Sequence, residues 1–260
     1  MTQILAFKLP VILFFLGFIL ILEGKGRFYQ YFKTHAQRWQ KHGVVFVITG
    51  LVSLSIVVPI TEWASEMVAW RASYPIFDAS WVLFFDLLIL DLWIYFWHRA
   101  NHRFDFLWRF HEIHHLDQDM DATTALRFHF GEVILSACFR AIVMLVLDIP
   151  LLHIMLFEVL VMCSAIFHHS RLKLPRWVEK YAYYMWVTPR YHHTHHHAKV
   201  EDLNSHFATL LPIWDRIFKT YHGYTDHYDA QMGVLDQKGQ LASDLPAIGL
   251  LKRPFARKIK

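Results

Sequence analysis

The sequence predicts an all-α, polytopic membrane helical bundle of about four to five membrane segments, one pair forming a helical hairpin, with a cytosolic helical, histidine-rich metal domain. Three observations support this prediction. Hydrophobic residues make up 55% of the 260 residues and charged residues 18%, whereas soluble domains contain about 25% charged residues. Four stretches are apolar enough to enter a bilayer. Nineteen histidines are present, and many are clustered at helical spacings. We treat residues 1–260 as a single integral-membrane domain.

The apolar stretches define the membrane segments in order. Residues 9–22 are expected to be a retained anchor, because they lack the basic start and small-residue cleavage site of a secretory signal. Residues 44–60 and 80–97 are the second and third segments. Residues 132–167 are too long for one pass, and Pro150 interrupts them because proline lacks an amide donor and disfavours helix before it. This last stretch is therefore predicted to be a hairpin.

The distribution of lysine and arginine predicts the orientation. The loop after the first segment is basic, whereas the loop before the third is mainly acidic; the basic residues are Lys25, Arg27, Lys33, Arg38 and Lys41, and the acidic ones Glu62, Glu66 and Asp78. We therefore expect residues 24–42, 98–130 and 168–260 on the cytoplasmic face of a bacterial inner membrane or the endoplasmic reticulum.

No nucleic-acid-binding motif is present. Cys138 and Cys163 lie in apolar stretches, which argues against a disulfide framework or a thiolate metal site.

Three histidine clusters have the spacing of metal ligands on helices. Residues three or four positions apart share one helix face, and the histidines that do so are His98 and His102, then His111, His114 and His115, then His192, His195 and His196. Three such faces on one side of the membrane predict a site for a pair of metal ions. Because imidazole binds iron, zinc, copper and nickel, the ligand type leaves the metal open.

An acid within the third apolar segment is a candidate partner for this site. Asp91 shares a helical stripe with Tyr95, His98 and His102, so it is expected to hold the distal nitrogen of a metal-bound histidine. The alternative is a polar residue that faces a partner helix or headgroups.

Two other functions are compatible with the histidines. The segment from His111 to His115 fits H-E-x-x-H, in which two histidines bind zinc and the glutamate, here Glu112, activates water. A membrane zinc metalloprotease or hydrolase is therefore one alternative, although it leaves two clusters unexplained and Glu112 is more simply a polar neighbour. A metal-binding or transport protein is the other. A transporter is expected to place its ligands near mid-membrane, whereas these clusters lie beyond the segment ends.

The boxes resemble those of the fatty acid hydroxylase and sterol desaturase superfamily of membrane di-iron oxygenases. The H-x-x-x-H box begins at His98, and H-x-x-H-H boxes begin at His111 and His192. Further segments resemble the family in the same order: 97–99, 123–132, 167–175, 188–189 and 213–221. We accordingly take residues 80–221 as the catalytic region. Phe130, Arg171 and Ser205-His206 depart from the usual family residues, which leaves the subfamily and the substrate open.

The resemblance implies a membrane-bound non-haem di-iron oxygenase that hydroxylates or desaturates a lipid C–H bond, of sterol, fatty acyl, sphingolipid or isoprenoid type. It implies two iron ions (Fe²⁺/Fe³⁺), with O₂ as co-substrate and zinc as a possible substitute. The ligands carried over are His98, His102, His111, His114, His115, His192, His195 and His196, with His169 as a further ligand, His168 as its alternative, and His129 in or next to the coordination shell. His193 and His197 fall at variable positions and are expected at the surface. Electrons are expected from a separate donor, a ferredoxin, cytochrome b5-type protein or reductase, because no haem-binding or flavin domain is evident.

Overall fold

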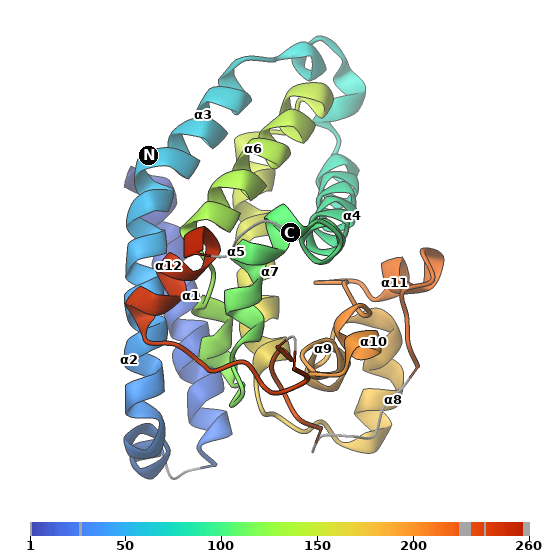
Figure 1. Ribbon diagram of the computed structural model, residues 1–260. Coiled ribbons are helices and arrows are strands. Elements are labelled where there is room, and N and C mark those ends of the chain that lie inside the picture. The colour runs from blue at the N-terminus through green and yellow to red at the C-terminus, as the bar shows by residue number, and fades with distance from the viewer. Residues whose placement is uncertain (1, 26–27, 224–229, 237, 257–260) are drawn as a thin grey trace.

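The computed structural model describes residues 2–25, 28–223, 230–236 and 238–256, and its regular structure is helical (Figure 1). The α-helices are α1 (Thr2–Glu23), α2 (Phe28–Val52), α3 (Val58–Glu66), α4 (Trp81–Arg103), α5 (Asp105–His115), α6 (Phe130–Leu147), α7 (Leu151–His169), α8 (Arg176–Met185), α9 (Pro189–His195), α10 (Val200–Leu203), α11 (Ile213–Ile217) and α12 (Ala247–Ala256). Short helical segments are the π-turn η1 (Ser53–Val57) and the 3₁₀ turns η2 (Trp70–Ser73), η3 (Pro75–Asp78) and η4 (Ala122–Leu126). The predicted all-α class is confirmed.

Within the described residues, four segments are long and apolar enough to cross a membrane: Gln30–Ser73, α4, α6 and α7. The predicted hairpin is present as α6 and α7. Asp148 ends α6 in the left-handed conformation, with φ 51° and ψ 47°, and Pro150 precedes the first residue of α7. The predicted first segment lies within α1, which packs along α7. The protein is an integral membrane protein by these spans.

The second membrane segment differs from the prediction. Residues 28–42 were expected in a basic loop, but they form the start of α2, which continues through η1 into α3. Two of the basic side chains of this region have carboxylate partners elsewhere in the fold, which favours helix over a solvated loop. Arg38 pairs with Asp117 and Asp121, and Lys41 pairs with Asp244. Arg27 lies outside the described residues.

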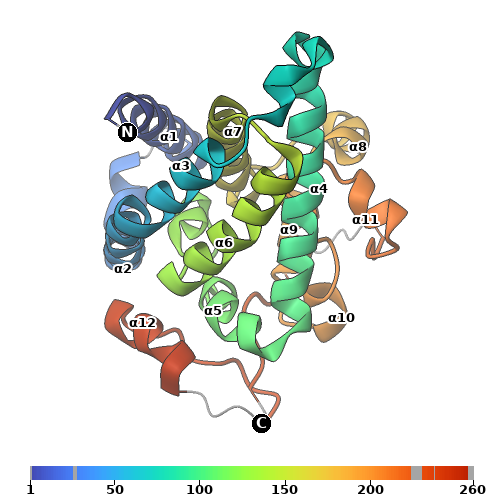
Figure 2. The ribbon, with the colours of Figure 1, turned by 90° about the horizontal axis from the view of Figure 1, so that it is seen from above.

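Apolar packing holds α3, α4, α6 and α7 together as a bundle. Shorter helices, among them α5, pack at one end of this bundle. Buried residues of α3, α4, α6 and α7 form one core, including Ala64, Leu90, Trp93 and Met144. Helix α5 packs against both α4 and α12. Both views place α5 between α12 on one side and α9 and α10 on the other (Figures 1 and 2). The histidine-bearing helices α5 and α9 are therefore held close to the end of α4.

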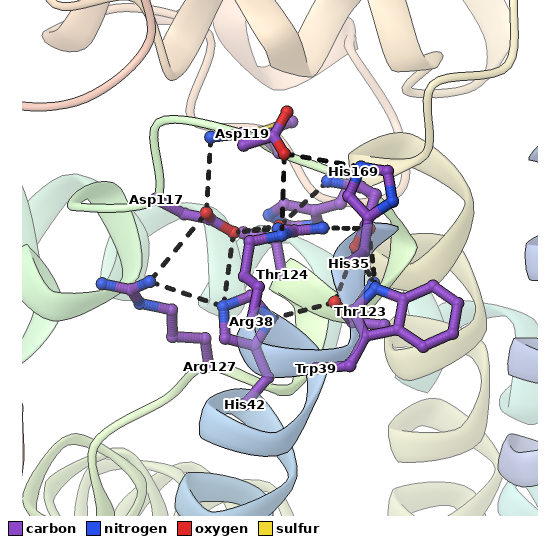
Figure 3. A network of polar contacts seen from close by, with 12 residues as sticks. His35, Arg38, Trp39, His42, Asp117, Asp119, Thr123, Thr124, Arg127 and His169 are labelled. Carbon is purple, nitrogen blue, oxygen red and sulfur yellow. Dashed lines mark hydrogen bonds and ion pairs between the residues drawn. The ribbon is translucent and has the colours of Figure 1, made fainter. Parts of the chain in front are cut away.

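A polar network fixes the loop that follows α5 onto α2 (Figure 3). Arg38 donates a hydrogen bond of 2.8 Å to Asp117 Oδ2 and also bonds Asp121. Trp39 Nε1 donates to Asp121 Oδ2 at 3.0 Å. Arg127 Nε donates to the carbonyl of Ile113 at 2.6 Å, inside α5. These contacts hold the C-terminal half of α5, and with it the second histidine cluster, in one position.

Candidate metal centre

The histidine clusters meet at the end of the bundle in two groups. We call His98, His102, His111, His115 and His195 the first histidine group, and His114, His169, His192 and His196 the second histidine group. Within each group, one candidate ligand atom per residue lies within 4.8 Å of every other. Nine of the ten histidines predicted as ligands are therefore brought together. His168 is buried and its ring lies 4.0 Å from that of His192, but it belongs to neither group.

Helix geometry explains how the clusters divide between two groups. In α5, His111 and His115 are four residues apart and join the first group, while His114 turns toward the second. His192 of α9 and His196, which directly follows this helix, join the second group, and His195 joins the first. Each helix thus contributes to both groups, as the i, i+3 and i+4 spacing allows. Helix α4 continues to Arg103, so its last turns carry His98 and His102 into the first histidine group.

Hydrogen bonds orient four of these rings. Carbonyl and carboxylate oxygens only accept, so a histidine nitrogen bonded to one of them carries the proton and leaves the other nitrogen free to bind a metal. The Nδ1 atoms held in this way are those of His98 on Phe207 O at 2.8 Å, His195 on Ser205 O at 2.7 Å, His169 on Ala165 O at 2.7 Å and His111 on Glu132 Oε1 at 2.9 Å. Their Nε2 atoms are left for the interior of the groups.

The remaining ring nitrogens fit the coordination of cations. The Nε2 atoms of His111 and His115 are 3.1 Å apart, and those of His114 and His169 are 2.9 Å apart. Within the two groups, the buried ring nitrogens that lack a hydrogen-bond partner in the described chain are Nε2 of His102 and His195 and Nδ1 of His114, His115, His192 and His196. Buried polar atoms without partners are costly. Two metal ions, each bound by the Nε2 atoms that converge within one group, would satisfy that side of the neutral imidazoles.

The carboxylate beside the groups is Glu132 and not Asp91. Asp91 accepts hydrogen bonds from the backbone amides of Leu210 and Leu211 and from Trp214 Nε1, so the predicted contact with a histidine is wrong. It fixes the turn before α11 instead. Glu132 accepts from His111 Nδ1 at 2.9 Å and from Asn101 Nδ2 at 3.2 Å. An acid in the first turn of an apolar helix was the sequence signal that could have identified Glu132.

Three other histidines lie elsewhere than predicted. His129 does not join either group: its Nδ1 accepts from the Gly131 amide at 2.9 Å and its Nε2 donates to Leu251 O at 3.0 Å, so it caps α6. His193 and His197 are buried, not at the surface. His193 Nε2 bonds Ser170 O, and His197 Nδ1 bonds Asp202 Oδ2. His193 therefore joins α9 to the residue after α7, and His197 joins the segment after α9 to α10.

Burial controls the protonation of the histidines outside the membrane-spanning helices. Desolvation, reinforced by neighbouring imidazoles, lowers the pKa of His114, His115, His192, His195 and His196 well below the usual value. These rings are therefore neutral, the form in which imidazole binds a metal.

We expect the metal-free protein to lose stability as the pH falls below about 6.5, the ordinary histidine pKa. In that range the unfolded chain binds protons that the folded chain does not, whereas above it both states are neutral. Thermal unfolding of metal-free protein in detergent, followed between pH 5 and pH 8, measures this dependence. A melting temperature that rises on acidification would contradict it.

A cavity of about 750 Å³ runs from the histidines into the bundle. At one end it is lined by His98, His111 and His114, and most of its remaining wall is apolar, from α1, α2, α4, α6 and α7. A volume of this size accommodates a drug-sized or lipid-sized ligand. The cavity thus connects the histidine groups with the membrane-spanning part of the protein.

The family model for fatty acid hydroxylases matches residues 82–220, which include both histidine groups. The chain belongs to the fatty acid hydroxylase family. Similar proteins include ornithine lipid hydroxylase OlsE of Rhizobium tropici, which is 26% identical over 66% of this chain and 50% of its own length. Alkylglycerol monooxygenase of Homo sapiens is 25% identical over 62% of this chain and 36% of its own length. Cholesterol 25-hydroxylase of Mus musculus is 27% identical over 52% of this chain and 44% of its own length.

The family match covers about half of the chain, and the chain spans half or less of the length of each of these relatives. No solved structure matches the chain significantly. Each of these relatives is named as a hydroxylase or a monooxygenase. The lipid in the name differs from one relative to the next.

Proposed function

We propose that this protein is a membrane-bound, di-iron lipid hydroxylase whose catalytic region is residues 80–221. The observation that supports this most strongly is the position of two buried histidine groups at the end of a largely apolar cavity. When bound, a pair of iron ions would supply the activation of O₂ for oxidation of a C–H bond. Zinc has no redox chemistry and would occupy the same imidazoles without activity.

The residues of the chain have three tasks in this proposal. The first and second histidine groups hold the metals, and Glu132 keeps the His111 ring in its orientation. The apolar cavity wall admits the lipid chain and excludes water from the reacting atoms. Hydroxylation consumes one O₂, two electrons and two protons, and it yields the alcohol and water. A separate electron donor of the ferredoxin, cytochrome b5 or reductase class is proposed to supply the electrons.

We propose that the histidine end faces the cytoplasm, on the basis of the lysine and arginine distribution. A cytoplasmic position would give a soluble electron donor access to this end. The buried histidine groups would then lie near the interface, and the lipid chain would enter from the membrane side.

Mass spectrometry of lipid extracts tests the proposed reaction. Cells with and without the protein are grown under ¹⁸O₂, and a lipid that carries one ¹⁸O atom only when the protein is present is the expected product. A product that has lost two hydrogens would show desaturation instead. Absence of any oxygen-dependent difference with iron-loaded protein would contradict the proposal.

The zinc hydrolase alternative receives no support from the geometry of Glu112. Its carboxylate is bonded by Arg253, from Nε at 2.8 Å and from the terminal nitrogen at 3.1 Å. A glutamate that activates water on a metal would have to face the histidines. In this protein Glu112 joins α5 to α12, while His111 and His115 belong to a group of five imidazoles.

Paired substitutions distinguish the two glutamates. Glu132→Gln is expected to lower metal affinity or activity about 10-fold or more, because partners of metal-bound histidines typically contribute 10–100-fold. Glu112→Gln is expected to change both much less, because the Glu112 carboxylate is bonded by Arg253 of α12 and a glutamine keeps an acceptor for that arginine. Activity and metal content are measured on equal amounts of folded protein. If Glu112→Gln were inactive and Glu132→Gln active, the hydrolase mechanism would be favoured.

A further inference from the structure

Three charged side chains meet inside the membrane-spanning part of the cavity, away from the histidines. Lys8 of α1 and Arg140 of α6 both pair with Glu158 of α7. The distance from the Arg140 guanidinium to Glu158 Oε1 is 2.7 Å, and Arg140 also donates to Thr61 Oγ1 at 3.1 Å. All four residues line the cavity that reaches the histidine groups. We call Lys8, Arg140 and Glu158 the ion cluster.

The ion cluster has donor capacity that the described protein residues do not use. Arg140 is only 7% exposed, yet its buried Nε atom has no hydrogen-bond partner within the described chain. Two cations, Lys8 and Arg140, pair with the single carboxylate of Glu158. Glu62 also lines the cavity but has an interaction of its own. Charged residues inside membrane segments are costly and usually mark a path for a polar group.

A comparison with Arg71, whose buried Nε atom also lacks a hydrogen-bond partner within the described chain, shows that the position on the cavity wall is what sets Arg140 apart. Arg71 pairs with both oxygens of Asp86, at 2.9 and 2.7 Å, and Asp86 also binds His153. That pair joins η2 to α4 and α7 and does not line the cavity. The ion cluster, by comparison, opens into the cavity, where the Glu158 side chain keeps 28% of its surface exposed.

We propose that the ion cluster binds an anionic oxygen group, a carboxylate or phosphate, of the lipid whose chain extends to the histidine groups. This inference rests on the proposed lipid hydroxylase function and names the substrate feature that the cavity recognises. Arg140 Nε and Lys8 Nζ donate to the anionic oxygens, and the apolar wall between the cluster and the histidines covers the chain.

The helices set the separation between the polar group and the oxidised carbon. Arg140 lies about two turns beyond Glu132 on α6, or about 12 Å along the axis at 1.5 Å per residue. Glu158 lies about three turns before His169 on α7, or about 16 Å. The lipid is therefore oxidised far along its chain and not next to its polar group.

A binding experiment without turnover tests the proposal. Full-length, zinc-loaded protein in a non-ionic detergent is titrated with palmitate, with hexadecan-1-ol as a neutral probe of the same chain length, and with inorganic phosphate. Palmitate is expected to bind roughly 10-fold more tightly than the alcohol, because hydrogen bonds to charged groups contribute more than neutral ones. Inorganic phosphate alone is expected to give no detectable binding at the same concentrations. Equal binding of palmitate and the alcohol, or binding of phosphate as tight as that of palmitate, would overturn the proposal.

Removing the cations and removing the carboxylate should have opposite effects on palmitate binding, and this separates ligand binding from a structural role. Arg140→Gln and Lys8→Gln are each expected to remove most of the preference for palmitate over the alcohol. Glu158→Gln is expected to strengthen palmitate binding several-fold, because it removes the carboxylate that competes for the two cations. A purely structural cluster predicts no gain for Glu158→Gln, and that result would contradict the proposal.

Arg71→Gln is the matched control, since it removes a partly buried, ion-paired arginine outside the cavity and should leave the preference unchanged. If Arg140→Gln does not fold, Lys8→Gln and Glu158→Gln decide the question. Because zinc-loaded protein is used, failure of the ion cluster is distinct from failure of the proposed reaction. Protein that binds palmitate in this way but oxidises no lipid when loaded with iron would overturn the proposed function alone.

Discussion

Replacement of His111 by alanine is expected to abolish oxygen-dependent lipid oxidation. His111 occupies the point where the two groups approach: its Nε2 lies 3.1 Å from His115 Nε2, and its ring lies 5.4 Å from that of His114 in the second group. Even outer partners of metal ligands contribute 10–100-fold, so loss of a ligand should reduce turnover by more than about 100-fold. Turnover and metal content are measured at matched levels of folded protein.

The control for His111→Ala is a buried histidine outside both groups. His129→Asn keeps a residue that caps a helix well, and we expect it to retain metal and substantial activity. His193→Ala should likewise remain active, because the ring of His193 bonds the backbone carbonyl of Ser170. Wild-type turnover in His111→Ala would show that the histidines do not form one site.

Arg38→Met is expected to reduce the free energy of unfolding by about 3–5 kcal/mol, the usual cost of removing one partner of a buried ion pair. Asp117 and Asp121 are both almost fully buried and both pair with Arg38. Burial would raise the pKa of Asp117, but Arg38 and Arg127 outweigh it and hold this pKa below its usual range. Without Arg38, charged carboxylates would remain beside Thr124 with fewer partners (Figure 3).

The free energy of unfolding in detergent measures this effect. Arg103→Met, at an exposed arginine that ends α4, should change it by no more than about 0.5 kcal/mol. Adding Asp117→Asn and Asp121→Asn to Arg38→Met should recover part of the lost stability, because no unpaired charge would remain. An Arg38→Met protein as stable as wild type would show that the network does not hold the loop after α5.

The sequence predicted the features that depend on local spacing. The three histidine clusters follow helix periodicity, and the α6–α7 break follows from Pro150, so both are visible without tertiary structure. Contacts between distant segments were not predictable in this way. Asp91 was assigned to a histidine because both share a stripe of α4, but its partners arrive from Leu210, about 120 residues later.

The same limit applies to Glu132 and to the basic residues of α2. Only the packing of α6 on α5 brings Glu132 to His111. Charge distribution suggested a solvated loop at residues 24–42, whereas Arg38 is paired with carboxylates from the loop after α5. His193 was placed at the surface by family variability, which does not report burial.

Metal analysis of iron-loaded protein tests the central claim most directly. The protein is stripped of metal, loaded with ferrous iron without oxygen, freed of excess metal and analysed for iron and zinc per chain. Two histidine groups predict about two iron ions per chain, and oxygen-dependent oxidation of lipid that increases with iron content. A single tightly bound zinc ion that iron does not replace, with activity independent of iron, would contradict the account.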